Sequence, residues 1–193
     1  MKKDLGVKPY LFPMPVLMIA TYGEDGAVDV MNMAWGGICG SNKVALNLGE
    51  RHKTTKNIEQ RMAFTISVAD IPHLKESDFF GIASGNDMAD KFERSGMHAV
   101  KSKFVDAPIV EEYPITLECK VVEIQKTADG PWRIIGEIVN VVADETVLDE
   151  KGQVDSTKLN AFVFDQMQYG YYAIGEKVGQ AWSSGTELMK ENE

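Results

Sequence analysis

Residues 114–144, PITLECKVVEIQKTADGPWRIIGEIVNVVAD, carry the strongest strand signal in this chain of 193 residues. Two runs rich in β-branched residues, 114–126 and 131–144, alternate between apolar and polar side chains. Alternation with a period of two is typical of a strand with one buried face. The Ala-Asp-Gly sequence at 128–130 lies between the runs and supplies a turn. The stretch therefore predicts a long antiparallel hairpin.

Other strand and helix signals lie on both sides of this hairpin. A second hairpin is predicted at 16–22 and 27–35, with an Asp-Gly turn, and single strands are predicted at 43–48 and 63–70. Two short helical pieces within 73–96 break at Gly85. A turn at 151–152 and a partly strand-like tail at 162–182 complete the chain. Strands that arrive as hairpins rather than as βαβ units favour a small barrel with helical insertions. We expect one domain over residues 1–193, mainly β, with about six antiparallel strands.

The chain is acidic, which limits its partners. Its formal net charge is −9, from 29 acidic and 20 basic residues. Nucleic acids and anionic membranes require a basic face, so both partners are disfavoured. No apolar run reaches the roughly 18 residues of a membrane span, and charged and proline residues interrupt the N-terminal run that resembles a signal peptide. We therefore expect a cytoplasmic protein with a small ligand.

The cysteines and histidines do not indicate a metal site. Cys39 and Cys119 do not form a CxxC pair, and the three histidines are scattered along the chain. We expect no metal, and we expect two buried thiols in a reducing compartment. A redox role of Cys39 is the minor alternative.

Positive charge gathers at one predicted helix start. In LGERHKTTKNIEQ, residues 48–60, the sequence Arg-His-Lys at 51–53 comes just before a helix that Thr54 or Thr55 can cap and that ends near residue 61. A helix N-terminus repels cations and attracts phosphate. Two interpretations remain open: a phosphate site, and a solvated basic turn beside an acidic neighbour.

A second segment, GIASGNDMADKF at 81–92, contains glycines that permit close approach of the backbone to a ligand. It is not a GxGxxG sequence after a strand, and the chain has no Walker lysine pattern. Neither a Rossmann domain nor a P-loop is therefore indicated. The alternative to a ligand loop is a joint between helices, with Lys91 on the surface and paired with Asp87.

Six segments in order resemble the flavin reductase-like family and, within it, the flavoredoxin group, over residues 10–175. They are a strand opening at residues 15–16, DVMNMAW (29–35), LGERHKTTKNI (48–58), GIASGNDMADKF (81–92), LECKVVE (117–123) and IGEIVNVVAD (135–144). The resemblance implies a six-stranded antiparallel split β-barrel that binds FMN non-covalently near the interface of a homodimer. It also implies that the anion at the basic helix start is the 5′-phosphate of FMN.

By the same resemblance, three parts of the chain would contact FMN. The end of the DVMNMAW strand would line the isoalloxazine ring, the helix start would hold the phosphate and ribityl chain, and the glycine-rich segment would approach from another side. The implied contacts are Asn32, Met33, Ala34, Trp35, Leu48, Gly49, Glu50, Arg51, His52, Lys53, Thr54, Ser84, Gly85, Asp90, Lys91 and Phe164. Lys91, as a charge that stabilises reduced flavin, and Trp35, as an aromatic wall, are the candidate catalytic residues.

One feature departs from the family pattern. Many members have a histidine shortly before the IGE strand motif, where this chain has Gly-Pro-Trp-Arg at 130–133. If that histidine serves nicotinamide binding or proton handling, Trp132 or Arg133 must replace it, or the activity differs.

The resemblance leads to three hypotheses of function. The first is an oxidoreductase that transfers hydride from NADH or NADPH to the flavin N5, and onward to an acceptor. The second is an electron-transfer flavoprotein reduced by a protein partner, which the acidic surface would steer. The third is a module that binds FMN without turnover.

Overall fold

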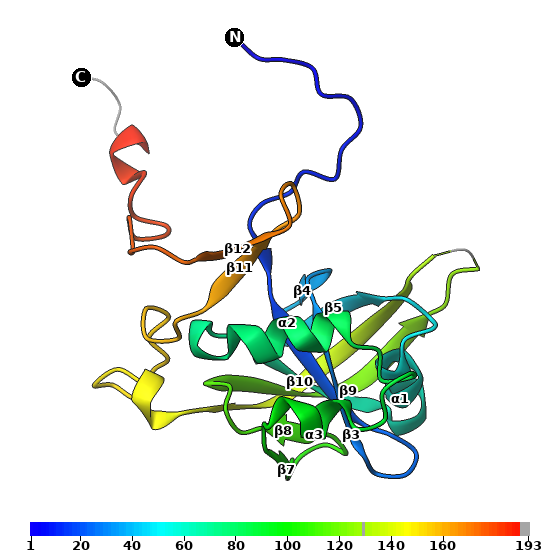
Figure 1. Ribbon diagram of the computed structural model, residues 1–193. Coiled ribbons are helices and arrows are strands. Elements are labelled where there is room, and N and C mark those ends of the chain that lie inside the picture. Colours follow the sequence, from blue (N-terminus) through cyan, green and yellow to red (C-terminus); the bar gives the residue numbers. More distant parts are fainter. Residues whose placement is uncertain (129, 190–193) are drawn as a thin grey trace.

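The computed structural model describes residues 1–128 and 130–189. Its main element is an antiparallel sheet with the strand order β3-β2-β6-β9-β10-β5-β4 (Figure 1). These strands are β2 (Leu17–Tyr22), β3 (Val28–Met33), β4 (Gly36–Ile38), β5 (Lys43–Leu48), β6 (Ala63–Val68), β9 (Ile115–Gln125) and β10 (Trp132–Ala143). The predicted mainly β fold is confirmed, but this sheet has seven strands and not six. The additional strand is β4, which at 3 residues is too short to show alternation.

Smaller elements surround the main sheet. Two small sheets contain β1 (Met14–Pro15), β11 (Phe162–Asp165) and β12 (Gly170–Ala173) in one, and β7 (Ala99–Lys101) and β8 (Pro108–Val110) in the other. The α-helices are α1 (Lys53–Arg61), α2 (Leu74–Ile82) and α3 (Lys91–Ser95), and the 3₁₀ helices are η1 (Ile71–His73), η2 (Glu145–Val147) and η3 (Thr186–Met189).

The predicted long hairpin forms the centre of the main sheet. Strands β9 and β10 pair with each other, and each also pairs with an outer neighbour, β6 for β9 and β5 for β10. The register shifts twice along the β9–β10 ladder, near Gly136 and near Asn140. Such bulges bend a strand and increase its twist. The turn predicted at residues 128–130 includes Asp129, which lies outside the described residues.

The connection between β3 and β4 closes the sheet on itself. These two strands form its opposite edges, yet only residues 34 and 35 lie between Met33 and Gly36. Three chain steps span at most about 11 Å. The two edges must therefore come together, and the sheet curls into a barrel rather than remaining open.

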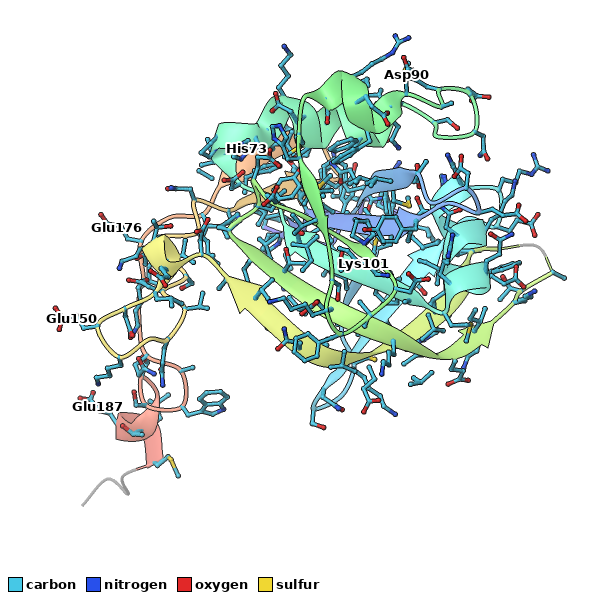
Figure 2. The ribbon with its side chains drawn as sticks, turned by 90° about the horizontal axis from the view of Figure 1, so that it is seen from below. His73, Asp90, Lys101, Glu150, Glu176 and Glu187 are labelled. Carbon is cyan, nitrogen blue, oxygen red and sulfur yellow. The ribbon has the colours of Figure 1, made fainter. Side chains whose placement is uncertain are left out.

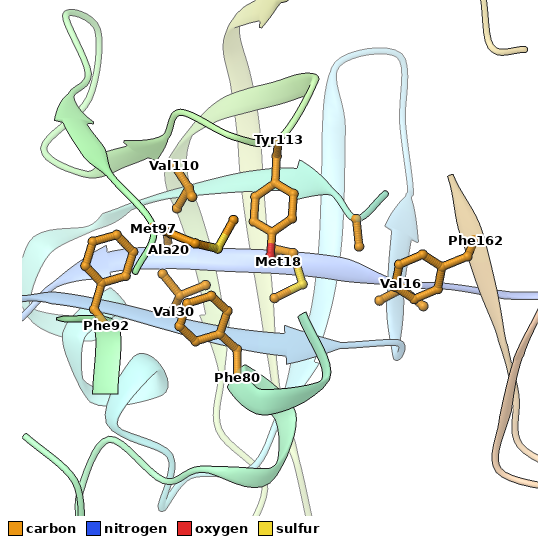
Figure 3. Packing of buried hydrophobic residues seen from close by; sticks show 11 residues of the cluster. Val16, Met18, Ala20, Val30, Phe80, Phe92, Met97, Val110, Tyr113 and Phe162 are labelled. Carbon is orange, nitrogen blue, oxygen red and sulfur yellow. The ribbon is translucent and has the colours of Figure 1, made fainter. Parts of the chain in front are cut away.

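Both faces of the curled sheet are buried where β2 crosses it. Met18 and Ala20 belong to one apolar cluster, and Ile19 between them belongs to another, as the pleat requires. In the first cluster, Phe80 of α2 and Phe92 of α3 pack over the strands (Figure 3). The second cluster fills the inside of the curl. The helices α2 and α3 thus cover the outer face of β2 and β3.

The remaining predicted elements are present with small shifts of their ends. The Asp-Gly hairpin joins β2 to β3, and Gly26 in its turn has a φ of 81°. The two helical pieces are α2 and α3, and Gly96 ends the second one in the left-handed region, where glycine carries no Cβ penalty. The turn at 151–152 is closed by a bridge between Leu148 and Val154.

The two cysteines occupy different environments. Cys119 is buried in the cluster inside the curl, and burial, together with the Glu118 carboxylate, raises the pKa of its thiol to about 12. Cys39 is exposed, so the prediction that both thiols are buried is wrong for this residue. It directly follows the short edge strand β4, where the chain turns at the surface.

Within residues 1–128 and 130–189, no group of three or more His, Cys, Asp or Glu side chains is arranged to hold a metal ion. Over the same residues, no helix has the length and apolar character needed to cross a membrane.

Candidate functional site

A cavity of about 560 Å³ lies where β3, the start of α1 and the α2–α3 connection meet. Its lining comes from three segments that are far apart in the sequence. They contribute Asp29, Met31, Asn32, Met33 and Trp35 from the first, Asn47, Leu48, Gly49, Arg51, His52, Lys53 and Thr54 from the second, and Phe80, Gly81, Ile82, Ala83, Ser84, Gly85, Asn86 and Lys91 from the third. The edge strand β3 and the strand β5, which lies next to the other edge strand β4, therefore both supply walls of this cavity.

Most of the sequence-predicted site residues line the cavity. They are Asn32, Met33, Trp35, Leu48, Gly49, Arg51, His52, Lys53, Thr54, Ser84, Gly85 and Lys91. The three segments that the sequence identifies separately thus meet at one place. As contacts of a cofactor, these residues remain predictions.

Four predicted residues are not among those that line the cavity. Ala34 is buried beside it, and Glu50 is exposed in the turn before α1. Asp90, labelled in Figure 2, lies at the start of α3, where its carboxylate accepts a hydrogen bond of 2.7 Å from Arg94 Nε. The ring of Phe164 lies 6.4 Å from the ring of Trp35 and so supports that wall from behind.

The sequence interpretation missed several lining residues. They are Asp29, Met31, Asn47, Phe80, Gly81, Ile82, Ala83 and Asn86. Asp29 had a readable signal, because it is an acidic residue inside an otherwise apolar strand run. Met31, Gly81, Ile82, Ala83 and Asn86 lie within the two segments 29–35 and 81–92, although they were not singled out there. Asn47 and Phe80 have no local signal, since they enter the site only through the curl of the sheet and the packing of α2.

The start of α1 lacks the predicted threonine cap. His52 is the N-cap residue, with extended backbone angles and no capping side-chain bond. The prediction of Thr54 or Thr55 is wrong, because both are already helical and their hydroxyls bond elsewhere. Thr54 Oγ1 donates to Asp29 at 2.6 Å, and Thr55 Oγ1 donates to the carbonyl of Gly49 at 2.8 Å.

The first turn of α1 is consequently a strong anion attractor. The N–H groups there have no side-chain acceptor, and the first turn contains no acidic residue. Arg51 and Lys53 add positive charge beside them. A helix start with free N–H groups and adjacent cations favours a phosphate or carboxylate.

Lys91 is buried in the cavity wall, with 5% of its side chain exposed. Its Nζ donates to the carbonyl of Ala83 at 3.1 Å and to that of Phe80 at 3.5 Å, both at the C-terminal end of α2. Its carboxylate neighbour is Asp29, at 3.8 Å, and not Asp87. Burial lowers the pKa of Lys91, Asp29 raises it, and Lys53 lowers it further.

The walls of the cavity are tied to one another by side-chain amides. Asn86 Nδ2 donates to the carbonyl of Arg51 at 2.9 Å and so joins the α2–α3 connection to the start of α1. Asn32 Nδ2 donates to the carbonyl of Ser77 at 3.0 Å and joins β3 to α2. Asn47 donates to the carbonyl of Trp35 at 3.0 Å from its backbone N–H and at 3.1 Å from Nδ2. Trp35 is held by its backbone while half of its side chain stays exposed.

Neither residue that could replace the family's histidine lines this cavity. The ring of Trp132 is covered by Lys126, whose Nζ lies 4.4 Å from the ring centre. Arg133 lines a neighbouring cavity of about 380 Å³, which shares Trp35 and Asn47 with the first.

The fold and this cavity define a class: a split β-barrel with a cationic cavity between the edges of its sheet. Residues 10–170 match the flavin reductase like domain, and the chain belongs to the flavin reductase-like family. Its structure is similar to that of flavoredoxin from Desulfovibrio vulgaris (Miyazaki F), with 35% identity, a TM-score of 0.90, and coverage of 96% of this chain and 100% of that chain.

Two other solved structures share the fold at lower identity. Flavoredoxin from Methanosarcina acetivorans is 21% identical, with a TM-score of 0.88 and coverage of 97% of this chain and 100% of that chain. A proposed flavin reductase with a split barrel domain from Shewanella frigidimarina is 22% identical, with a TM-score of 0.76 and coverage of 86% and 84%. The predicted family and split-barrel fold are thus confirmed.

The contact of Gly85 with Asp29 gives a test of how tightly the cavity is built. A Cβ at residue 85 would lie 2.3 Å from Asp29 Oδ1 and 3.0 Å from Lys53 Cδ. We expect Gly85→Ala to lower the free energy of unfolding by about 1–3 kcal/mol, measured by urea denaturation. Gly40→Ala is the control, because its Cβ would meet only Lys43, at 3.5 Å. Equal stability of the two variants would contradict this packing.

Proposed function

We propose that the cavity binds FMN and that the protein is a flavin-dependent oxidoreductase of the flavin reductase type. The observation that carries this proposal is the cationic, uncapped start of α1, which opens into a cavity of about 560 Å³ in a chain of net charge −9. Membership of the flavin reductase-like family supports the same ligand. Ligand cavities of this size are common for small molecules and cofactors.

The residues present fit a molecule that is anionic at one end and flat and apolar at the other. The start of α1, with Arg51 and Lys53, would hold the phosphate. Met33 and Trp35 would border the isoalloxazine ring, with Phe164 supporting Trp35. Gly85 packs closely against Asp29 and Lys53 in the cavity wall, where the smallest side chain would already clash with the Asp29 carboxylate.

When bound, FMN would supply hydride and electron chemistry at its N5, with NADH or NADPH as the donor in the reductase case. The chain's own residues would bind and orient the ring. Lys91 would hold a positive charge at the cavity wall, and the Asn32, Asn47 and Asn86 amides would keep the walls in place. No side chain is required as a general acid or base.

The phosphate assignment is tested with the double variant Arg51→Ala, Lys53→Ala. Because it removes two cations from the start of α1, we expect its affinity for FMN to fall by about a hundredfold or more, measured by fluorescence titration. Its affinity for riboflavin, which lacks the phosphate, should change little.

The matched control is Lys56→Ala, Lys75→Ala, which removes two exposed cations that do not line the cavity. This control should retain the affinity for FMN. Unchanged FMN affinity in the Arg51, Lys53 variant would contradict a phosphate site at the start of α1.

A second candidate function is electron transfer with a protein partner. It is favoured by the 35% identity to a flavoredoxin and by the acidic surface, which would steer a basic or iron–sulfur partner. Its rate of reduction by such a partner should fall as salt is added.

Anaerobic absorbance spectra decide between the functions. For a reductase, addition of NADH or NADPH should bleach the flavin bands of the FMN-loaded protein within seconds. Bands that persist with both donors but bleach with a reduced protein partner would favour electron transfer. Bands that no donor bleaches would leave a binding module.

We also propose that the protein forms a homodimer. Residues 1–13 and the segment from Ile174 to Met189 extend away from the barrel (Figure 1) and expose Leu5, Leu11, Val178 and Trp182. Exposed apolar side chains on extended arms are typical of segments that pack on another subunit. We expect sedimentation equilibrium at micromolar concentration to give twice the mass of one chain. A monomer under these conditions would contradict the proposal.

A further inference from the structure

Asp29 has a position that a flavin phosphate site does not explain. Its carboxylate is 3% exposed and lines the same cavity as Arg51 and Lys53. A negative charge in an anion-binding cavity repels the ligand, and a buried charge is costly to desolvate. The residue therefore needs a compensating role inside the site.

The hydrogen bond from Thr54 explains only part of the role of Asp29. Thr54 Oγ1 donates to Oδ2 at 2.6 Å, which ties β3 to the first turn of α1. A neutral acceptor such as an asparagine oxygen would serve the same hydroxyl. The hydrogen bond thus explains a polar side chain at residue 29 but does not explain its charge.

Lys91 does explain the charge. Its ammonium is buried, and its two hydrogen bonds go to the neutral carbonyls of Phe80 and Ala83. Among the described residues, Asp29 is the carboxylate within 4 Å of Lys91 Nζ, at 3.8 Å. A second cation, Lys53 of α1, faces the same space and opposes protonation of Lys91. Without Asp29, a buried ammonium would face another cation with no opposite charge.

We propose that Asp29 is a positioning residue for Lys91: its buried carboxylate keeps the Lys91 ammonium charged at the wall of the cavity. This inference rests on the proposed FMN site, because there the charge of Lys91 acts on the ligand. Asp29 then favours anion binding indirectly, although its own charge opposes it. The backbone of Gly85, packed against Oδ1, holds the carboxylate in place.

The first test needs no cofactor. The pKa of Lys91 is followed by the ¹³Cε shift of its NMR signal, which is assigned by its loss in Lys91→Arg. We expect Asp29→Asn to lower this pKa further, because the negative charge that raises it is removed while burial and Lys53 remain. Thr54→Val is the control that removes only the hydroxyl, and it should leave the Lys91 pKa unchanged. An unchanged pKa in Asp29→Asn would overturn the proposal.

The second test measures the affinity for FMN at two pH values. The direction of the change at each pH distinguishes an effect of charge from an effect on structure. At a pH below the Lys91 pKa that NMR gives for Asp29→Asn, this variant should bind FMN as well as the wild type or better, because a repulsion is lost. At a pH between that pKa and the higher Lys91 pKa of the wild type, it should bind about tenfold more weakly, because only the variant has lost the proton of Lys91. Comparing the variant with the wild type at each pH removes the titration of FMN itself.

The double variant completes the design. In a Lys91→Met background, Asp29→Asn should produce no such pH-dependent loss of affinity. The same loss in that background, or a loss of equal size at both pH values, would show that Asp29 acts on structure and would overturn the inference. If the wild type fails to bind FMN, the proposed function fails, whereas the NMR measurement still decides whether Asp29 and Lys91 form the pair.

Discussion

The short connection between β3 and β4 is the constraint on which the rest of the structure depends. Two residues join the opposite edges of a seven-stranded sheet, so the sheet must curl until those edges meet. The long β9–β10 ladder, with its two bulges, supplies the curvature on the other side of the barrel. The cavity lies where the edges meet, and both β3 and β5 contribute to its wall.

The cavity gathers positive charge, whereas the chain as a whole is negatively charged. A protein of net charge −9 places Arg51, Lys53 and Lys91 around one space, at the start of a helix that disfavours cations. Such an arrangement is unfavourable for the folded chain alone and becomes favourable when an anion is bound. The buried Asp29 balances part of this charge from β3, and the carbonyls at the end of α2 balance another part. Two elements, β3 and the C-terminal end of α2, therefore compensate the buried charge of Lys91.

Much of the fold was readable from local patterns. Alternation predicted the hairpins β2–β3 and β9–β10, Gly85 lies in the break between α2 and α3, and Gly96 marks the end of α3. The errors have two causes. Thr54 looked like a cap because a hydroxyl beside a helix start usually bonds the backbone, but here the buried Asp29 from a distant strand takes that hydroxyl. Cys39 looked buried because cysteines usually are, but it follows an edge strand too short to read.

The sequence by itself determined that the chain is mainly β and that its strands pair as hairpins, and it predicted a site at a basic helix start and a glycine-rich segment. These features depend on neighbours within a few residues, where side-chain periodicity and turn chemistry act directly. Only the tertiary structure decided that the sheet has seven strands, that Lys91 pairs with Asp29 and not with Asp87, and that Asn86 joins two loops. Those contacts join residues tens of positions apart, and their distances follow from the curl of the whole sheet, which no local pattern records.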